Sequence, residues 1–215
     1  MSGDMSVPAE GSKPPLFLRI GFWACTGIAV AVVIRRLVAL AAPPSSSPPG
    51  LAALDGAFSN HAALILAHIL PALLFVILVP IALLRKTPRA AWAEQLLFPL
   101  GAVVGITAYA MSQYSIGGWV ERSAVLFFNT LFLISLFQAF RYQKRGEPAL
   151  KRKWLLRAII VLLGIATTRP VIGIFFTTSR LTHLTPSQFF GIAFWIGFSI
   201  NTIIGEIWIG RRSDP

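Results

Sequence analysis

The side chains of this sequence that could do chemistry are the few polar and ionisable residues inside long apolar stretches. They are Arg35, Arg36, His61, His68, Asn129, Arg169, Asn201 and Glu206. Because a charged or polar group is costly inside a bilayer, such residues face a site, pair with one another or reach the headgroups. Arginine and histidine donors would bind an anionic headgroup, a carboxylate or a quinone carbonyl. The sequence contains no recognisable catalytic motif, which favours binding by a non-enzymatic protein.

Several of these residues are expected to lie at similar depths in the membrane, judged by their positions along the apolar stretches. Arg35, His68 and Arg169 lie 16, 17 and 12 residues from basic residues at one end of their stretches. At about 1.5 Å of rise per helical residue, they lie roughly 24, 26 and 18 Å from that end. We therefore expect an outward-facing, net-positive pocket lined by His68, Arg169, Arg35, Arg36 and Asn129. It would bind a small or lipidic anion, or a partner subunit.

These residues also have simpler structural interpretations. Arg35 and Arg36 can extend to the outer headgroups, and Arg169 can donate to carbonyl groups freed by the proline that follows it. Near the opposite end, Arg157 and Glu206 are expected to form a structural ion pair. A proton relay through Glu206 is the alternative.

Two further function classes remain open. A haem-handling or redox protein could use His68 as a single axial ligand, although no other span offers a clear histidine. A proton-coupled transporter could use Glu206 and Arg169. No metal site is expected, because no set of three or four zinc ligands is apparent, and Cys25 has no second cysteine for a disulfide. Apart from haem in the first of these classes, no cofactor is expected.

The elements that must position these residues are apolar stretches long enough to cross a bilayer. The sequence is 55% hydrophobic and only 13% charged, and a membrane-spanning helix needs about 20 apolar residues. We predict an all-α integral membrane bundle of about six transmembrane helices, over 16–42, 60–84, 94–113, 123–140, 154–178 and 185–209. They form a single transmembrane domain, 16–212, after a disordered cytoplasmic tail, 1–15. Two arginines interrupt the first stretch, which argues against a cleaved signal peptide.

The basic residues set the expected orientation. The net charge is +11, and most of it falls on the tail, on every second loop and on the C-terminus. These residues are Lys13, Arg19, Arg85, Lys86, Arg89, Arg141, Lys144, Arg145, Lys151, Arg152, Lys153, Arg211 and Arg212, whereas the other side has little beyond Arg122 and Arg180. The positive-inside rule places both termini in the cytoplasm, where the basic loops would contact anionic lipid. Charge at helix ends also argues against nucleic acid.

Several local motifs resemble those of a bacterial family of predicted multi-pass membrane proteins of unknown function. The resemblance runs from His68 to the end of the chain, and the residues that carry it are His68-Ile69, Gly117-Gly118-Trp119, Lys151-Arg152-Lys153-Trp154-Leu155-Leu156-Arg157, Thr168-Arg169, and Asn201 with Glu206-Ile207-Trp208. It implies the same span count. The resemblance also marks His68, Arg157, Arg169 and Glu206. Separately, we expect a bacterial inner-membrane location, with a membrane protein partner or a homo-oligomer as further possibilities.

The sequence departs from the family pattern at two places. Lys151 stands where the family usually has a histidine before its basic tryptophan motif, and Pro88-Arg89-Ala90-Ala91 stands in place of a His-Arg pair. If those histidines bind a metal or haem in relatives, the resemblance implies that this chain has lost that ability.

Overall fold

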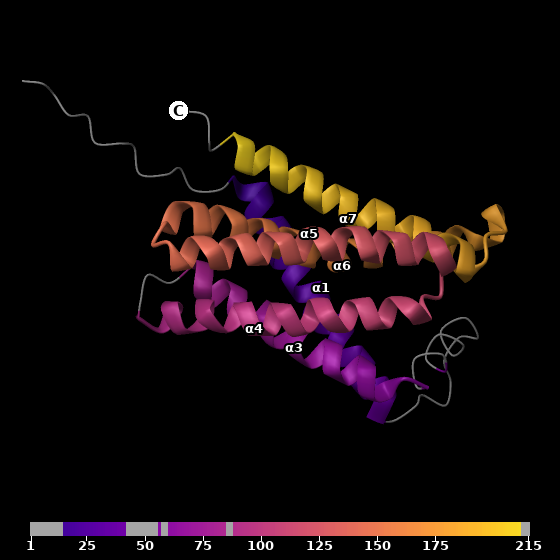
Figure 1. Ribbon diagram of the computed structural model, residues 1–215. Coiled ribbons are helices and arrows are strands. Elements are labelled where there is room, and N and C mark those ends of the chain that lie inside the picture. Colours follow the sequence, from indigo (N-terminus) through magenta and orange to yellow (C-terminus); the bar gives the residue numbers. More distant parts are fainter. Residues whose placement is uncertain (1–14, 42–55, 57–59, 85–87, 212–215) are drawn as a thin grey trace, which may run out of the picture.

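The described helices match the apolar stretches of the sequence. The computed structural model describes residues 15–41, 56, 60–84 and 88–211. In chain order the elements are α1 (Leu16–Ala41), α3 (Ala62–Leu84), α4 (Pro88–Met111), the short 3₁₀ helix η1 (Ser112–Tyr114), α5 (Gly118–Lys144), α6 (Pro148–Thr182) and α7 (Pro186–Gly210) (Figure 1). Six of these helices are long and apolar enough to cross a membrane. The predicted fold class, an all-α membrane bundle of about six helices, is confirmed.

Some sequence predictions fall on residues that the structure does not describe. The predicted disordered tail lies almost wholly outside the described residues, which begin at residue 15. Lys13, Arg85, Lys86 and Arg212 also lie outside them.

The helices extend beyond the predicted spans at the basic end. The sequence predicts a loop from Arg141 to Lys153, but α5 continues to Lys144 and α6 already begins at Pro148. Lysine and arginine are good helix formers, and hydropathy marks only the part of a helix that lies in hydrocarbon. The connection is therefore residues 145–147, where Gly146 has a φ of 69° and lets the chain turn back.

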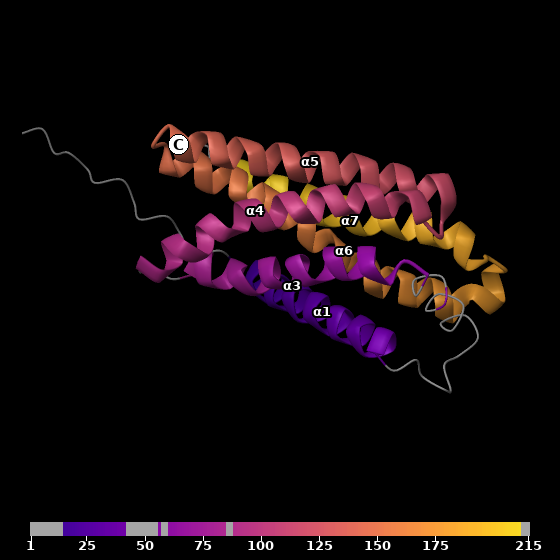
Figure 2. The same ribbon diagram turned by 60° about the horizontal axis from the view of Figure 1, so that its bottom comes forward.

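Successive helices run in opposite directions along the bundle. The connections from α4 to α5 and from α6 to α7 lie at one end, and the connection from α5 to α6 lies at the other with the end of α7 (Figures 1 and 2). The α5–α6 end contains Arg141, Lys144, Arg145, Lys151, Arg152 and Lys153. We refer to it as the basic end and to the opposite one as the η1 end.

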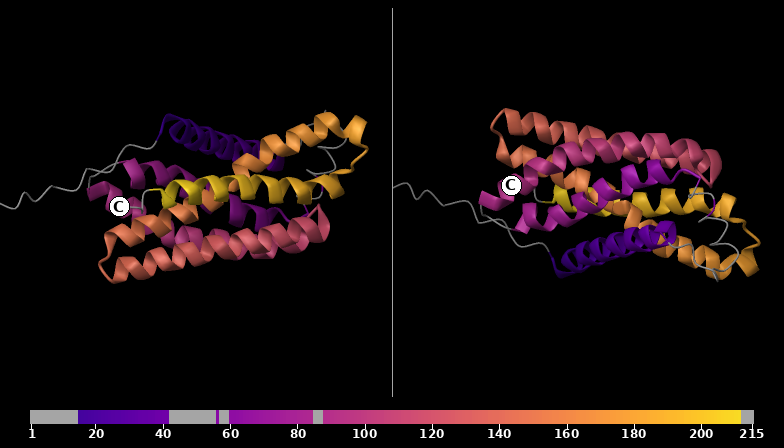
Figure 3. Two further views of the ribbon diagram at one scale, coloured as in Figure 1. Left: turned by 90° about the horizontal axis from the view of Figure 1, so that it is seen from above. Right: turned by 90° about the horizontal axis from the view of Figure 1, so that it is seen from below.

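Helix α1 is the most peripheral element of the bundle. It lies along one edge of the bundle in both views of Figure 3 and packs mainly against α3 and α6. Only one of its residues, Ala29, is buried within the protein. The remaining helices are packed around phenylalanine side chains, including Phe75 and Phe132, whose rings meet edge to face at 6.0 Å. Most side chains of α1 are therefore left to contact lipid, because the other helices cover few of them.

Glycines bring α7 into backbone contact with α5 and α6. A Cβ atom added at Gly191 would lie 2.7 Å from the backbone nitrogen of Glu121, and one at Gly197 would lie 2.6 Å from the Cα atom of Thr168. Lipid supplies no hydrophobic force between helices, so close packing through small residues is what holds them together. These two glycines fix where α7 meets α5 and α6.

We predict that Gly197→Ala destabilises the bundle, because the added methyl group meets backbone atoms of Thr168 that cannot move independently. Overpacking of this kind costs about 1–3 kcal/mol, which thermal unfolding in detergent would detect as a lower Tm. Gly173→Ala in α6 is the matched control, since a Cβ atom there meets no atom within 4 Å. Equal Tm values for the two variants would contradict the packing argument.

Candidate functional site

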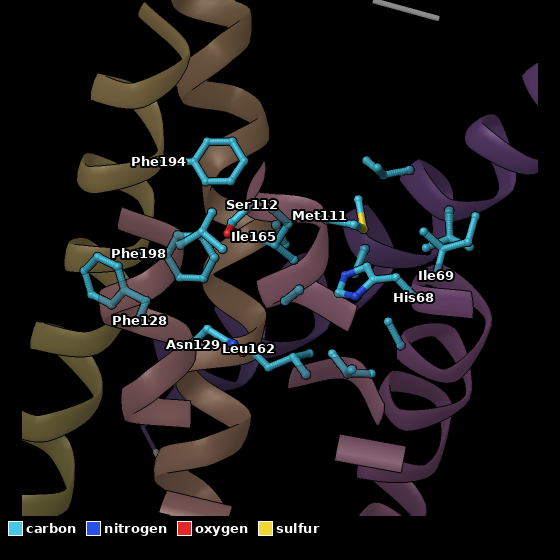
Figure 4. A pocket seen from close by; sticks show the side chains of 18 of the residues that line it. His68, Ile69, Met111, Ser112, Phe128, Asn129, Leu162, Ile165, Phe194 and Phe198 are labelled. Carbon is cyan, nitrogen blue, oxygen red and sulfur yellow. The ribbon is translucent and has the colours of Figure 1, made fainter. Parts of the chain in front are cut away.

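A cavity of about 410 Å³ lies in the η1-end half of the bundle. Side chains from all six helices and η1 line it. The lining includes all five residues that the sequence predicts for the pocket, namely Arg35 and Arg36 from α1, His68 from α3, Asn129 from α5 and Arg169 from α6. Figure 4 shows His68 and Asn129 on opposite sides of this cavity. The structure thus brings these five residues to one place, and their role in ligand binding stays a prediction.

Arg169 has an incomplete set of hydrogen bonds. Its Nε atom is buried and has no hydrogen-bond partner. The guanidinium group interacts electrostatically with Arg36 and Arg35, which repel it, and with Glu121, which attracts it. A buried donor without an acceptor costs free energy, so the Nε atom of Arg169 is an unsatisfied donor in the cavity wall.

Glu121 is the cavity residue that sequence reasoning missed. Its carboxylate lines the cavity, the residue is only 9% exposed, and the carboxylate accepts a 2.6 Å hydrogen bond from the backbone N–H of Gly117. Glu121 lies in the first turn of α5, where a negative charge is favoured by the helix dipole. Its position beside the motif Gly117-Gly118-Trp119 is the sequence signal that could have pointed to Glu121.

His68 and Asn129 are both hydrogen-bonded to α4. The Nδ1 atom of His68 lies 2.9 Å from the hydroxyl oxygen of Thr107, and the amide nitrogen of Asn129 donates to the carbonyl of Gly105 over 2.9 Å. Because Gly105 and Thr107 are two residues apart, His68 and Asn129 lie at similar depth. These bonds fix the two side chains and satisfy part of their polar capacity, in contrast to Arg169.

The cavity changes from charged to apolar along its length. Helices α1 and α6 run towards the η1 end, whereas α3 and α5 run away from it (Figure 1). Arg35 and Arg36 in the last turns of α1 and Glu121 in the first turn of α5 therefore lie towards the η1 end. Arg169 interacts electrostatically with all three. The inner part is lined by apolar side chains one to three turns further in, including Ala29, Val76, Phe132 and Val161. The arrangement is that of an amphipathic site with its charge at one end.

Arg157 and Glu206 form a separate pair towards the basic end. The Nε and Nη2 atoms of Arg157 donate to the two carboxylate oxygens of Glu206 over 2.7 and 2.8 Å. The Arg157 guanidinium also lies 4.6 Å from the ring centre of Trp154. Neither Arg157 nor Glu206 lines the cavity, so Glu206 and Arg169 do not share a site. Whether the pair is structural or relays protons stays a prediction.

Other candidates from the sequence have local partners. Lys151 forms an ion pair with Glu94 of α4 at 2.8 Å. His61 stacks on Tyr114 with ring centres 3.7 Å apart. Asn201 accepts a 2.7 Å hydrogen bond from Thr167 and donates to a backbone carbonyl of α6. Among the described residues, no three histidine, cysteine or acidic side chains are close enough to hold a metal ion.

These features define a multi-pass α-helical membrane protein with a largely apolar cavity that also contains three arginines and a glutamate. The chain belongs to a family described as "Predicted membrane protein (DUF2306)", whose model matches residues 65–209. This match confirms the resemblance that the sequence motifs indicated. The function of the family is unknown. Comparison with curated proteins and with solved structures gave no match. Helix α1 precedes the matched segment.

We predict that Arg157 and Glu206 are energetically coupled. Arg157→Gln, Glu206→Gln and the double variant form a double-mutant cycle, to be measured by unfolding in detergent. Because the two side chains are 22% and 45% exposed, the coupling free energy should be about 0.2–1 kcal/mol, as for other accessible pairs. Additive effects of the two substitutions would show that the ion pair contributes nothing to stability.

Proposed function

We propose that this protein binds a small or lipidic anion in the outward-facing cavity. The observation that carries the proposal is the charge of the cavity wall, which has three arginines and one glutamate. With His68 taken as neutral, the lining has a net charge of +2 from these four residues. Positive charge on a cavity wall favours an anion through charge-assisted hydrogen bonds. A volume of about 410 Å³ is within the range of about 300–1,000 Å³ typical of small-molecule sites.

We further propose that the membrane is a bacterial inner membrane, with the basic end and both termini on the cytoplasmic side. The proposal is supported by the concentration of lysine and arginine at that end. Contacts of these residues with anionic lipid would help to keep the protein in this orientation. The cavity would then open towards the periplasmic half of the bilayer.

Orientation is testable with reporter fusions. A green fluorescent protein fused after Pro215 should fluoresce, and alkaline phosphatase at the same position should be inactive, because the C-terminus is expected inside. Alkaline phosphatase fused after Ser115, in the turn at the η1 end, should be active. The reverse pattern would place the cavity on the cytoplasmic side and refute the outward-facing site.

Anion binding is testable by thermal stabilisation. In nanodiscs of neutral phosphatidylcholine, dodecanoate, acetate, inorganic phosphate or phosphatidylglycerol should raise the Tm, since a ligand at 100 times its Kd stabilises by about 2.7 kcal/mol. The rise should be lost in the double variant Arg35→Gln/Arg36→Gln. Arg152→Gln, which changes an exposed arginine at the basic end, is the control. No response to any of the four anions would overturn the proposal.

The haem and transport hypotheses have their own readouts. Haem binding would give a Soret band that is lost in His68→Ala, and that result would favour the haem hypothesis over anion binding. Proton-coupled transport would require flux that falls in Glu206→Gln. The proposal of anion binding predicts no effect of Glu206→Gln on the thermal response, because Glu206 is paired with Arg157 away from the cavity.

A further inference from the structure

We infer that the ligand is an amphiphile with a single apolar chain and one anionic group, a carboxylate or a phosphate. The anionic group would bind Arg169 in the outer part of the cavity, and the chain would extend inwards along the apolar part. Glu121 would act as the resident counter-ion that this group competes with. The inference rests on the proposed function and names its ligand class.

The position of the anionic group follows from the hydrogen bonds of the cavity wall. His68 and Asn129 already bond to Thr107 and Gly105 of α4. The Nε atom of Arg169 has no acceptor. A ligand oxygen at this atom would remove the cost of an unsatisfied buried donor, and the planar guanidinium would present a second N–H for a bidentate contact. Among the cavity residues, Arg169 is therefore the one whose hydrogen bonds an anion would complete.

The charge of that anion is limited by Glu121. Arg36 and Arg35 add positive charge near Arg169, and Glu121 removes some of it. The Glu121 carboxylate is held in place by the N–H of Gly117. The backbone of Glu121 is packed against Gly191, which keeps this residue at its place beside the cavity. A ligand therefore meets a positive site that already contains one fixed carboxylate, which makes a single small anionic group the best match.

The apolar chain follows from the depth of the cavity. Glu121 and Phe132 both line it and are eleven residues apart on α5, which is about 16 Å at the rise of an α-helix. Beyond His68 and Asn129 the wall is apolar, with Ala72, Val76 and Leu162 among its residues. A small hydrophilic anion would leave this part unfilled. Two acyl chains of a phospholipid would need far more than about 410 Å³.

The experiment uses dodecanoate with a photoreactive diazirine at the end of its chain, added to the full-length protein in phosphatidylcholine nanodiscs. After illumination, mass spectrometry locates the labelled residues. We expect saturable labelling of inner wall residues such as Val76, Phe132 and Val161. Unlabelled dodecanoate or dodecyl phosphate should compete, whereas methyl dodecanoate, which lacks the charge, should not. Competition by the uncharged ester would overturn the inference, because binding would then not require an anionic group. This test needs no protein variant.

Variants then test the anionic site. Arg169→Gln should reduce labelling at least tenfold, and Arg169→Lys, which keeps the charge but loses the planar donor, should reduce it less. Glu121→Gln keeps an acceptor for the N–H of Gly117 and removes the competing charge, so labelling should increase severalfold. A Tm within a few degrees of wild type shows that a variant is folded. Labelling that is unchanged in both Arg169 variants would overturn the assignment of the anionic group.

The outcomes separate this inference from the proposed function. If dodecanoate gives no saturable labelling but acetate, phosphate or phosphatidylglycerol raises the Tm through Arg35 and Arg36, the single-chain ligand is wrong and anion binding stands. If none of these anions acts, both proposals fail.

Discussion

Backbone contact between α7 and its neighbours is the constraint on which the rest of the structure depends. Helices in lipid gain nothing from hiding apolar side chains from one another, so the glycine contacts at Gly191 and Gly197 decide how α7 meets α5 and α6. Gly191 lies on the backbone of Glu121, and Gly197 lies on Thr168, the residue before Arg169. The same contacts that hold the three helices therefore set the acid and the arginine of the cavity near each other.

The cavity combines two kinds of polar group that the fold treats differently. His68 and Asn129 are used to join α3 and α5 to α4, as interhelical hydrogen bonds commonly do in membranes. The arginines near the η1 end are instead gathered from α1 and α6, and one carboxylate offsets part of their charge. Mutual repulsion of three guanidinium groups is unfavourable in a low-dielectric site. The carboxylate of Glu121 attracts the Arg169 guanidinium and so offsets part of this repulsion.

The sequence could predict much of this arrangement because charge in hydrocarbon is rare. Apolar stretches of bilayer length indicated the number of spans, and the positions of Arg35, His68 and Arg169 within them indicated one cavity. Glu121 could not be found this way, since it lies beside Arg122 near the end of an apolar stretch, and only the packing of Gly117 and Gly191 buries it. Helix ends were misjudged because hydropathy reports the surrounding solvent and does not report where backbone hydrogen bonding stops.

The low burial of α1 within the bundle has a consequence for which substitutions the protein can tolerate. This helix supplies two of the three cavity arginines, yet only Ala29 is buried among its residues. It also lies outside the segment that the family model matches. Substitution of Arg35 or Arg36 would change the charge of the cavity wall without removing a buried side chain. Under the proposal of anion binding, α1 is therefore the helix whose cavity residues can be exchanged while the packing among the other five helices is kept.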